Sequence, residues 1–147
     1  MTSSENLRDQ AVDRFWETIP PLWTMVRSYI RAQATTSCDI TVEQFHVLRY
    51  VRKGPGSMSE LATAKNISRP AISQAVEILV KKGLLTRVHS TQDRRYVELA
   101  LTEAGNNLLD TVFKQTRKWM KERMHGLSAD ELQTITNAME IMKKIVE

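Results

Sequence analysis

The stretch from Leu84 to Leu101 constrains the fold of this 147-residue chain most, because its pattern of apolar residues changes there. Elsewhere apolar residues recur at helical spacing, whereas within this stretch residues 85–89 and 97–101 alternate in character. Alternation predicts strands, since successive side chains of a strand point to opposite faces. The polar residues 90–95 between the two runs would form the tip of a hairpin. A small β-hairpin is therefore expected within an otherwise helical chain.

Capping signals mark where helices begin on both sides of this hairpin. Ser68 can cap one helix, with Pro70 tolerated in its first turn and Gly83 at its end. Three other segments have the Ser/Thr-x-x-Glu/Gln form of a capping box and precede apolar residues at helical spacing: Thr41–Gln44, Ser57–Glu60 and Ser128–Glu131.

Two longer helices are expected over roughly residues 6–33 and 102–123, where apolar residues form a stripe. Pro20-Pro21 lies inside the first of them and removes two amide donors. We expect either a kink at this point or a new helix capped by Thr18. The predicted fold is mainly α with a small β-hairpin (α+β), in the order ααααββαα. Because no long linker separates the elements, we expect a single domain over residues 1–147.

Composition and cysteine content narrow the class of protein. Hydrophobic residues make up 41% and charged residues 26% of the chain, which is typical of a globular domain. The longest apolar runs are only a few residues, too short to cross a bilayer. Cys38 is the single cysteine, so no internal disulfide can form, which fits a reducing compartment. We expect a cytoplasmic protein with no membrane contact.

The net charge of +4 is concentrated in one segment of the chain. Between Ser68 and Tyr96 there are six basic and two acidic residues, which leaves the remaining chain neutral. A neutral body with one basic segment is the charge layout of a surface that binds a polyanion. A solvated basic helix would have a similar composition, so charge alone leaves that alternative open.

Two short helices followed by a hairpin are typical of a winged helix-turn-helix. Residues 57–65 would then form the positioning helix, and residues 68–82 the recognition helix that enters the major groove of DNA. Ser73 and Gln74 lie in its second turn, where both side chains can bind base edges. Arg69 and the amides after Ser68 favour phosphate at the positive end of the helix. The alternative is that Ser68 only caps the helix and Gln74 is only solvated.

The hairpin tip carries the sequence Asp93-Arg94-Arg95. An arginine on a protruding loop can enter a narrow minor groove, where the negative potential is enhanced. We expect Asp93 to pair with one arginine and hold the shape of the loop, which leaves the other free to reach DNA. Lys82 and Arg87 flank the recognition helix and would add contacts with phosphate. The alternative is an exposed arginine pair with no partner beyond solvent.

These motifs resemble the MarR (multiple-antibiotic-resistance regulator) family of winged helix-turn-helix transcription factors, over about residues 40–106. The helix that begins at Thr41 is similar to the second helix of that family. The other matching segments are Leu61-Ala62, Ser68 to Gln74, Leu79, Lys82 to Leu84, Asp93 to Arg95 and Leu99 to Gly105.

The resemblance implies a homodimer that binds a pseudo-palindromic double-stranded DNA operator, generally as a repressor. Residues 1–37 and 102–147 would form the helical dimerisation region, and residues 38–101 the winged helix-turn-helix lobe. The expected DNA-binding residues are Ser68, Arg69, Pro70, Ser73, Gln74, Lys82, Arg87, Arg94 and Arg95, with Asp93 holding the wing. A winged helix used only for protein interaction is the alternative, and it predicts no salt-dependent DNA binding.

Members of this family mostly respond to small aromatic or phenolic molecules, which implies an effector site beside the dimerisation helices. Trp23, Phe45, His46 and Arg49 could line it, with Arg49 pairing with an anionic group. The alternative is that Phe45 belongs to the core and Arg49 is only exposed.

Cys38 raises a second alternative, a repressor that senses oxidants. In that branch of the family the reactive cysteine lies within the first helix, whereas Cys38 follows it beside Asp39. The negative charge of Asp39 should raise the pKa of the thiol and make it less reactive. The sequence therefore disfavours a redox role for Cys38.

Catalysis and metal binding find little support in the sequence. His46, His89 and His125 are scattered, with no pair at the spacing of metal ligands. His89, Ser90 and Asp93 have the residue types of a catalytic triad, but they crowd a hairpin tip that cannot enclose an oxyanion pocket. We expect a protein that is not an enzyme and that needs no metal or other cofactor.

Overall fold

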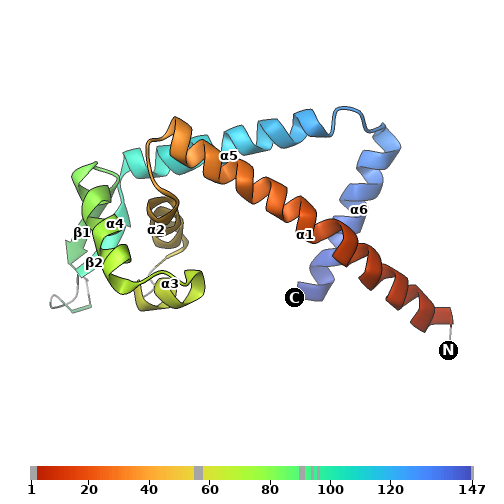
Figure 1. The fold of residues 1–147 in the computed structure, drawn as a ribbon, viewed down its shortest axis with the longest axis horizontal. Coiled ribbons are helices and arrows are strands. Elements are labelled where there is room, and N and C mark those ends of the chain that lie inside the picture. Colours follow the sequence, from red (N-terminus) through yellow and green to blue (C-terminus); the bar gives the residue numbers. More distant parts are fainter. Residues whose placement is uncertain (1–2, 55–57, 90–91, 94, 96, 147) are drawn as a thin grey trace. The chain divides into compact units, whose positions relative to one another are not determined.

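The computed structural model describes residues 3–54, 58–89, 92–93, 95 and 97–146. The described elements are helices and one two-stranded hairpin, and they follow one another in the predicted order (Figure 1). The helices are α1 (Ser3–Ser37), α2 (Val42–Lys53), α3 (Met58–Lys65), α4 (Arg69–Lys81), α5 (Glu103–Arg123) and α6 (Ala129–Val146), and the strands are β1 (Leu85–His89) and β2 (Val97–Leu101). The prediction of a mainly α fold with a small hairpin is confirmed.

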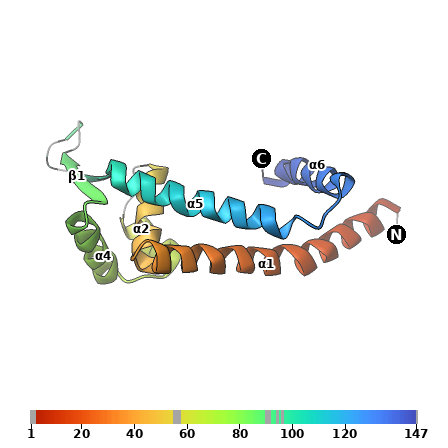
Figure 2. The same ribbon diagram turned by 90° about the horizontal axis from the view of Figure 1, so that it is seen from above.

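The pair Pro20-Pro21 lies within α1 and does not divide it. The predicted alternative of a new helix capped by Thr18 is therefore wrong. Each proline removes a hydrogen bond to the carbonyl group four residues earlier, here those of Trp16 and Glu17. Both residues are exposed, so water can bind the freed carbonyl groups. Figure 2 shows α1 as one ribbon that bends partway along its length, as expected for prolines inside a helix.

Capping hydrogen bonds start the helices where the sequence predicts them. The Thr41 hydroxyl accepts from the Gln44 amide at 3.1 Å, and the Gln44 side chain accepts from the Thr41 amide at 3.1 Å. Ser128 and Glu131 form the same reciprocal pair at 3.3 and 2.8 Å. Ser57, predicted to begin the third box, lies outside the described residues. These caps fix the starts of α2 and α6 locally.

The chain forms two compact units, residues 1–116 and 117–147. In the first unit one core joins α1, α2, α3, α4, β1 and α5. Its largest fully buried side chains are Phe45, Val47, Leu48, Leu61, Ile72, Leu79, Leu85, Leu109 and Val112. The strands β1 and β2 pair antiparallel, from Leu85 opposite Leu101 to His89 opposite Val97.

The start of α5 is attached to the turn between α4 and β1. The Thr102 hydroxyl donates to the Gly83 carbonyl at 2.6 Å and accepts from the Gly105 amide at 3.0 Å. A side chain at Gly105 would lie 2.2 Å from the Leu84 carbonyl oxygen, so glycine is needed for this close approach. The hairpin therefore has a fixed position beside α4, with α5 packed against its base.

The second unit consists of the end of α5 and of α6. None of the side chains of α6 is buried within the chain. Its exposed large apolar side chains are Leu132, Met139, Ile141, Ile145 and Val146. Within the described part of the chain, no helix combines the length and hydrophobicity needed to span a bilayer.

Candidate nucleic-acid interface

The helix α4 has one buried and one exposed face, as its sequence spacing predicts. The buried residues are Ile72, Ala75, Val76 and Leu79. The opposite face is polar and open to solvent over Ser68, Arg69, Pro70, Ser73, Gln74 and Glu77. Every expected base-contacting or phosphate-contacting residue of this helix therefore lies on its accessible face.

The beginning of α4 is set by a cap and by the tight turn after α3. The Ser68 hydroxyl accepts from the Ala71 amide at 3.3 Å, and Pro70 occupies the first turn. Asn66 has a φ of 51°, a left-handed conformation that asparagine tolerates better than most residues. The Ile67 amide donates to the Ala62 carbonyl at 3.0 Å across the turn. This geometry leaves the positive end of α4 exposed, where an anion such as phosphate is favoured. Sequence reasoning missed Asn66, although an asparagine between two helical segments is a turn signal.

At the hairpin tip, Asp93 pairs with Arg95. The Arg95 guanidinium donates through Nη2 to Asp93 Oδ2 at 2.8 Å and through Nε to Oδ1 at 3.1 Å, and its backbone amide donates to Oδ1 at 3.0 Å. These bonds to Arg95 hold the pKa of Asp93 below its usual range. Arg94, expected to enter the minor groove, lies outside the described residues.

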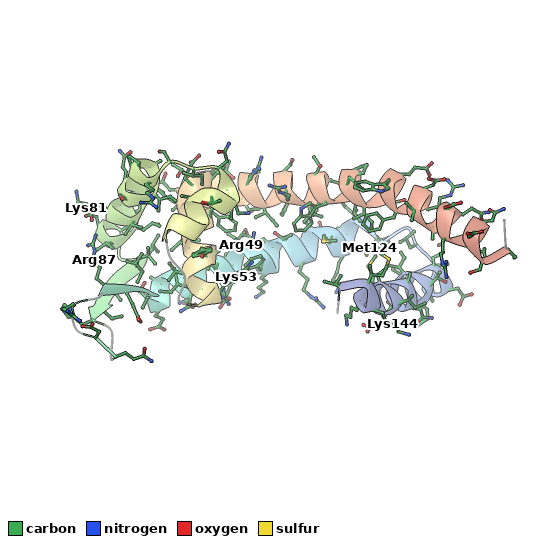
Figure 3. All side chains as sticks on the ribbon, turned by 90° about the horizontal axis from the view of Figure 1, so that it is seen from below. Arg49, Lys53, Lys81, Arg87, Met124 and Lys144 are labelled. Carbon is green, nitrogen blue, oxygen red and sulfur yellow. The ribbon has the colours of Figure 1, made fainter. Side chains whose placement is uncertain are left out.

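Lys82 and Arg87, both expected to contact phosphate, have acidic partners within the chain. The Lys82 ammonium donates to the Asp39 carbonyl oxygen and lies 3.8 Å from Asp39 Oδ2. Arg87 Nη2 forms an ion pair with Glu77 Oε1. Figure 3 shows Arg87 beside Lys81 at the outer edge of the first unit. Sequence reasoning missed both pairs, because each joins separate elements of the fold.

The residues expected to bind an effector are only partly brought together. Phe45 is buried, and its ring centroid lies 6.5 Å from that of His46. The Arg49 guanidinium lies 5.9 Å from the Phe45 ring centroid and 5.5 Å from that of Phe113 on α5, at cation–π distances. Trp23 on α1 is 52% exposed and shares no ring contact with these residues in the described part of the chain.

Positive charges on α1, α2 and α3 act on His46. Its pKa is lowered by burial and then by the charges of Lys65, Arg49, Arg31 and Arg27. The pKa of Lys65 is lowered by burial and by the same arginines together with Lys53. His46 Nδ1 is buried without a hydrogen-bond partner among the described residues. Sequence reasoning found His46 and Arg49 but missed the other cations, which come from distant elements.

Cys38 follows α1 and is partly buried. Burial raises the pKa of its thiol, so the direction is as predicted. The predicted cause was wrong, because desolvation and not the charge of Asp39 produces the shift. A raised pKa lowers the thiolate fraction and hence the reactivity. The part of the chain that the structure describes holds no group of three histidine, cysteine or acidic side chains suited to a metal ion.

Comparison with known proteins relates this geometry to a family. Residues 39–95 match the profile of the MarR family. The HTH-type transcriptional regulator YpoP of Bacillus subtilis (strain 168) is 28% identical over 98 residues, which are 66% of this chain and 70% of that protein.

Two solved structures illustrate the shared fold. The transcriptional regulator Tm0710 from Thermotoga maritima superposes with a TM-score of 0.80 at 22% identity, over 90% of this chain and 94% of that one. A mutant of MepR from S. aureus, bound to an oligodeoxyribonucleotide, gives a TM-score of 0.64 at 20% identity, over 90% of this chain and 98% of that one. The winged helix-turn-helix fold expected from the sequence is confirmed.

Proposed function

Because this chain belongs to the MarR family of DNA-binding transcriptional regulators, we propose that it is a homodimeric repressor of a pseudo-palindromic operator. A small aromatic or phenolic effector would release it from the DNA. The proposal places the protein in the cytoplasm, together with the DNA that it regulates.

The accessible polar face of α4 is the observation that carries this proposal. Ser73 and Gln74 lie on it in the second turn, at the depth where a recognition helix meets base edges. Arg69 and the exposed start of the helix would bind phosphate on one side. The wing would bind the adjacent minor groove through Arg94, while Arg95 keeps its bonds to Asp93.

Exposed apolar side chains on the terminal helices support the dimer. Trp16 is 66% exposed on α1, and Ile141 and Ile145 are 63% and 77% exposed on α6. Large apolar side chains gain about 1.5–3 kcal/mol each when they are fully buried, so a second copy would stabilise these helices. Two-fold symmetry would then present two recognition helices about 34 Å apart, one helical turn of DNA.

The cations around His46 support an effector with a negative charge. The Arg49 guanidinium lies near the rings of Phe45 and Phe113, so its charge is beside an aromatic surface. The charges of Arg27, Arg31 and Lys65 add to that of Arg49. An aromatic carboxylate would match both features, since its ring can pack on apolar side chains and its anion can pair with arginine. Trp23 would contribute from α1.

Selection of binding sites from random DNA tests the operator, and light scattering of the complex tests the dimer. We expect a two-fold symmetric site bound by two chains. Adding benzoate as a probe should weaken binding, and an Arg49→Ala variant should respond less. A single chain bound to one half-site would contradict the dimer. Release by benzoate that is unchanged in Arg49→Ala would contradict the effector site.

A further inference from the structure

The exposed face of α4 contains one negative charge. Glu77 is the single acidic residue between Ser68 and Lys82. It follows Ser73 by four residues and Gln74 by three, so all three side chains share one face of the helix. The Glu77 side chain is 57% exposed, whereas Ile72, Val76 and Leu79 occupy the buried face. Glu77 therefore continues the row of side chains that is proposed to read DNA bases.

Arg87 reaches Glu77 from the first strand of the wing. Alternation along β1 places Arg87 on the same side of the hairpin as Leu85, which is buried in the core beside α4. Its Nη2 forms an ion pair with Glu77 Oε1. The Arg87 side chain remains 43% exposed, so the pair lies at the surface and joins the recognition helix to the wing.

Stability alone gives little reason for a carboxylate at this position. An ion pair between exposed side chains contributes little to the stability of a fold, because water screens the two charges. Phosphates repel an unpaired carboxylate, so Glu77 without Arg87 would weaken binding to every DNA sequence. Arg87 neutralises that charge and engages Oε1, which leaves Oε2 as an oriented acceptor. A carboxylate in the major groove accepts a hydrogen bond from the exocyclic amine of cytosine.

We propose that Glu77 is a specificity-determining residue that selects a cytosine in each operator half-site, with Arg87 as its positioning residue. The inference rests on the proposed function, because it requires α4 to enter the major groove. It adds a base contact beyond those expected of Ser73 and Gln74. It also gives Arg87 a different role from the phosphate contact expected from the sequence.

The first test is Glu77→Gln in the full-length protein, with binding sites selected from random DNA for the variant and the wild type. Glutamine has nearly the same shape but no charge, and its amide favours adenine. We expect the preference for cytosine to fall about tenfold at one position of each half-site, which is within the range of a single base contact. Affinity for random DNA should rise, because Glu77→Gln leaves the positive charge of Arg87 without its acidic partner and so available to phosphate.

Asp110→Asn is the matched control. Asp110 on α5 forms an ion pair with Arg52 on α2, and the two side chains are 59% and 38% exposed. The change removes the same charge from a similarly exposed pair between elements, but away from α4. We expect the selected site to stay the same. A loss of the same cytosine preference in this control would overturn the proposal.

Two further variants test whether the Glu77–Arg87 pair reads a base or only holds α4 and β1 together. Arg87→Met should loosen the cytosine preference at the same position, since it leaves Glu77 without its orienting partner. The exchange Glu77→Arg with Arg87→Glu rebuilds the ion pair in reverse, and we expect the preference at that position to move to guanine. If the exchanged protein regained the wild-type preference, the ion pair would have only a structural role, and the proposal would be overturned.

The outcome for the wild type separates this inference from the proposed function. If the wild type selects no sequence, the proposed function fails and the role of Glu77 fails with it. If the wild type selects an operator and Glu77→Gln selects the same one with equal preference, only the role of Glu77 is overturned.

Discussion

The winged helix-turn-helix lobe and the last helix, α6, have the same apolar periodicity, but their apolar faces are covered differently. In the lobe, the apolar faces of α2 and α4 pack into a core that fully buries Phe45, Leu48 and Leu79. In α6 the stripe is equally regular, yet no side chain is buried within the chain. The difference teaches that periodicity identifies an apolar face but not what covers it. Within the lobe, other parts of the same chain cover this face, and for α6 we propose that a second copy of the chain covers it.

Deletion of Ser128 to Glu147 should have the largest effect on dimerisation and on operator binding. It removes the apolar side chains of α6, each of which contributes about 1.5–3 kcal/mol when it is fully buried. We expect the dimer to become a monomer or to aggregate, and operator affinity to collapse with it. Light scattering measures the first effect, and a gel-shift titration measures the second. A soluble dimer with native operator affinity would contradict the proposed role of α6.

Single alanine substitutions should have the next largest effects, and these effects should differ between the lobe and α6. Leu79→Ala creates a cavity in the closed core and should reduce the free energy of unfolding by about 2–5 kcal/mol. Ile145→Ala, at a position 77% exposed in the single chain, should leave the thermal stability of a dilute monomer almost unchanged but raise the dimer dissociation constant. Thermal denaturation and sedimentation at several concentrations would check both. If Ile145→Ala lowered the thermal stability of the dilute monomer as strongly as it weakened the dimer, the proposed difference between the two regions would be contradicted.

Within the lobe, the two arginines of the wing should behave differently. Arg94→Ala should weaken operator binding by about 1–3 kcal/mol, the scale of one groove contact, without changing helix content or dimerisation. Arg95→Ala should loosen the loop instead, because Arg95 holds Asp93 through side-chain and backbone bonds. Gel-shift titrations of both variants at one salt concentration test this. Unchanged affinity in Arg94→Ala would refute insertion of that side chain into the minor groove.

The smallest effect concerns the pH dependence of the wing. Bonds from Arg95 lower the pKa of Asp93 from its ordinary value of 3.8. A carboxyl group with a lowered pKa stabilises the folded loop above its ordinary value, and this contribution is lost as the pH falls through the lower folded-state value. The loop should therefore keep these bonds at neutral pH and lose them only in strong acid. An NMR titration of the Asp93 carboxyl carbon measures this, and in Arg95→Ala the pKa should return toward 3.8. An identical titration in both proteins would show that the bonds do not form in solution.

Local signals made much of the fold predictable. Capping at Thr41, Ser68 and Ser128 and the alternation along the hairpin depend on residues a few positions apart, and all of them are present in the structure. Thr18 begins no helix, because the exposed backbone around Pro20-Pro21 tolerates the loss of two hydrogen bonds.

Features that depend on tertiary packing could not be predicted in the same way. Lys82 meets Asp39 across 43 positions of sequence, and Arg87 meets Glu77 because β1 packs beside α4. The charges around His46 likewise come from three helices. Sequence composition showed that the central segment is basic, but only the fold shows which of its cations already have acidic partners.

The central claim is that the exposed face of α4 reads bases, whereas residues at its end and on the wing position the protein on the DNA. The most direct measurement compares Gln74→Ala with Lys82→Ala on a panel of operators, each with one base pair changed, at one stated salt concentration. We predict that Gln74→Ala loses its preference at one position of each half-site, whereas Lys82→Ala weakens binding to all sequences about equally. Full base preference in Gln74→Ala would contradict the account.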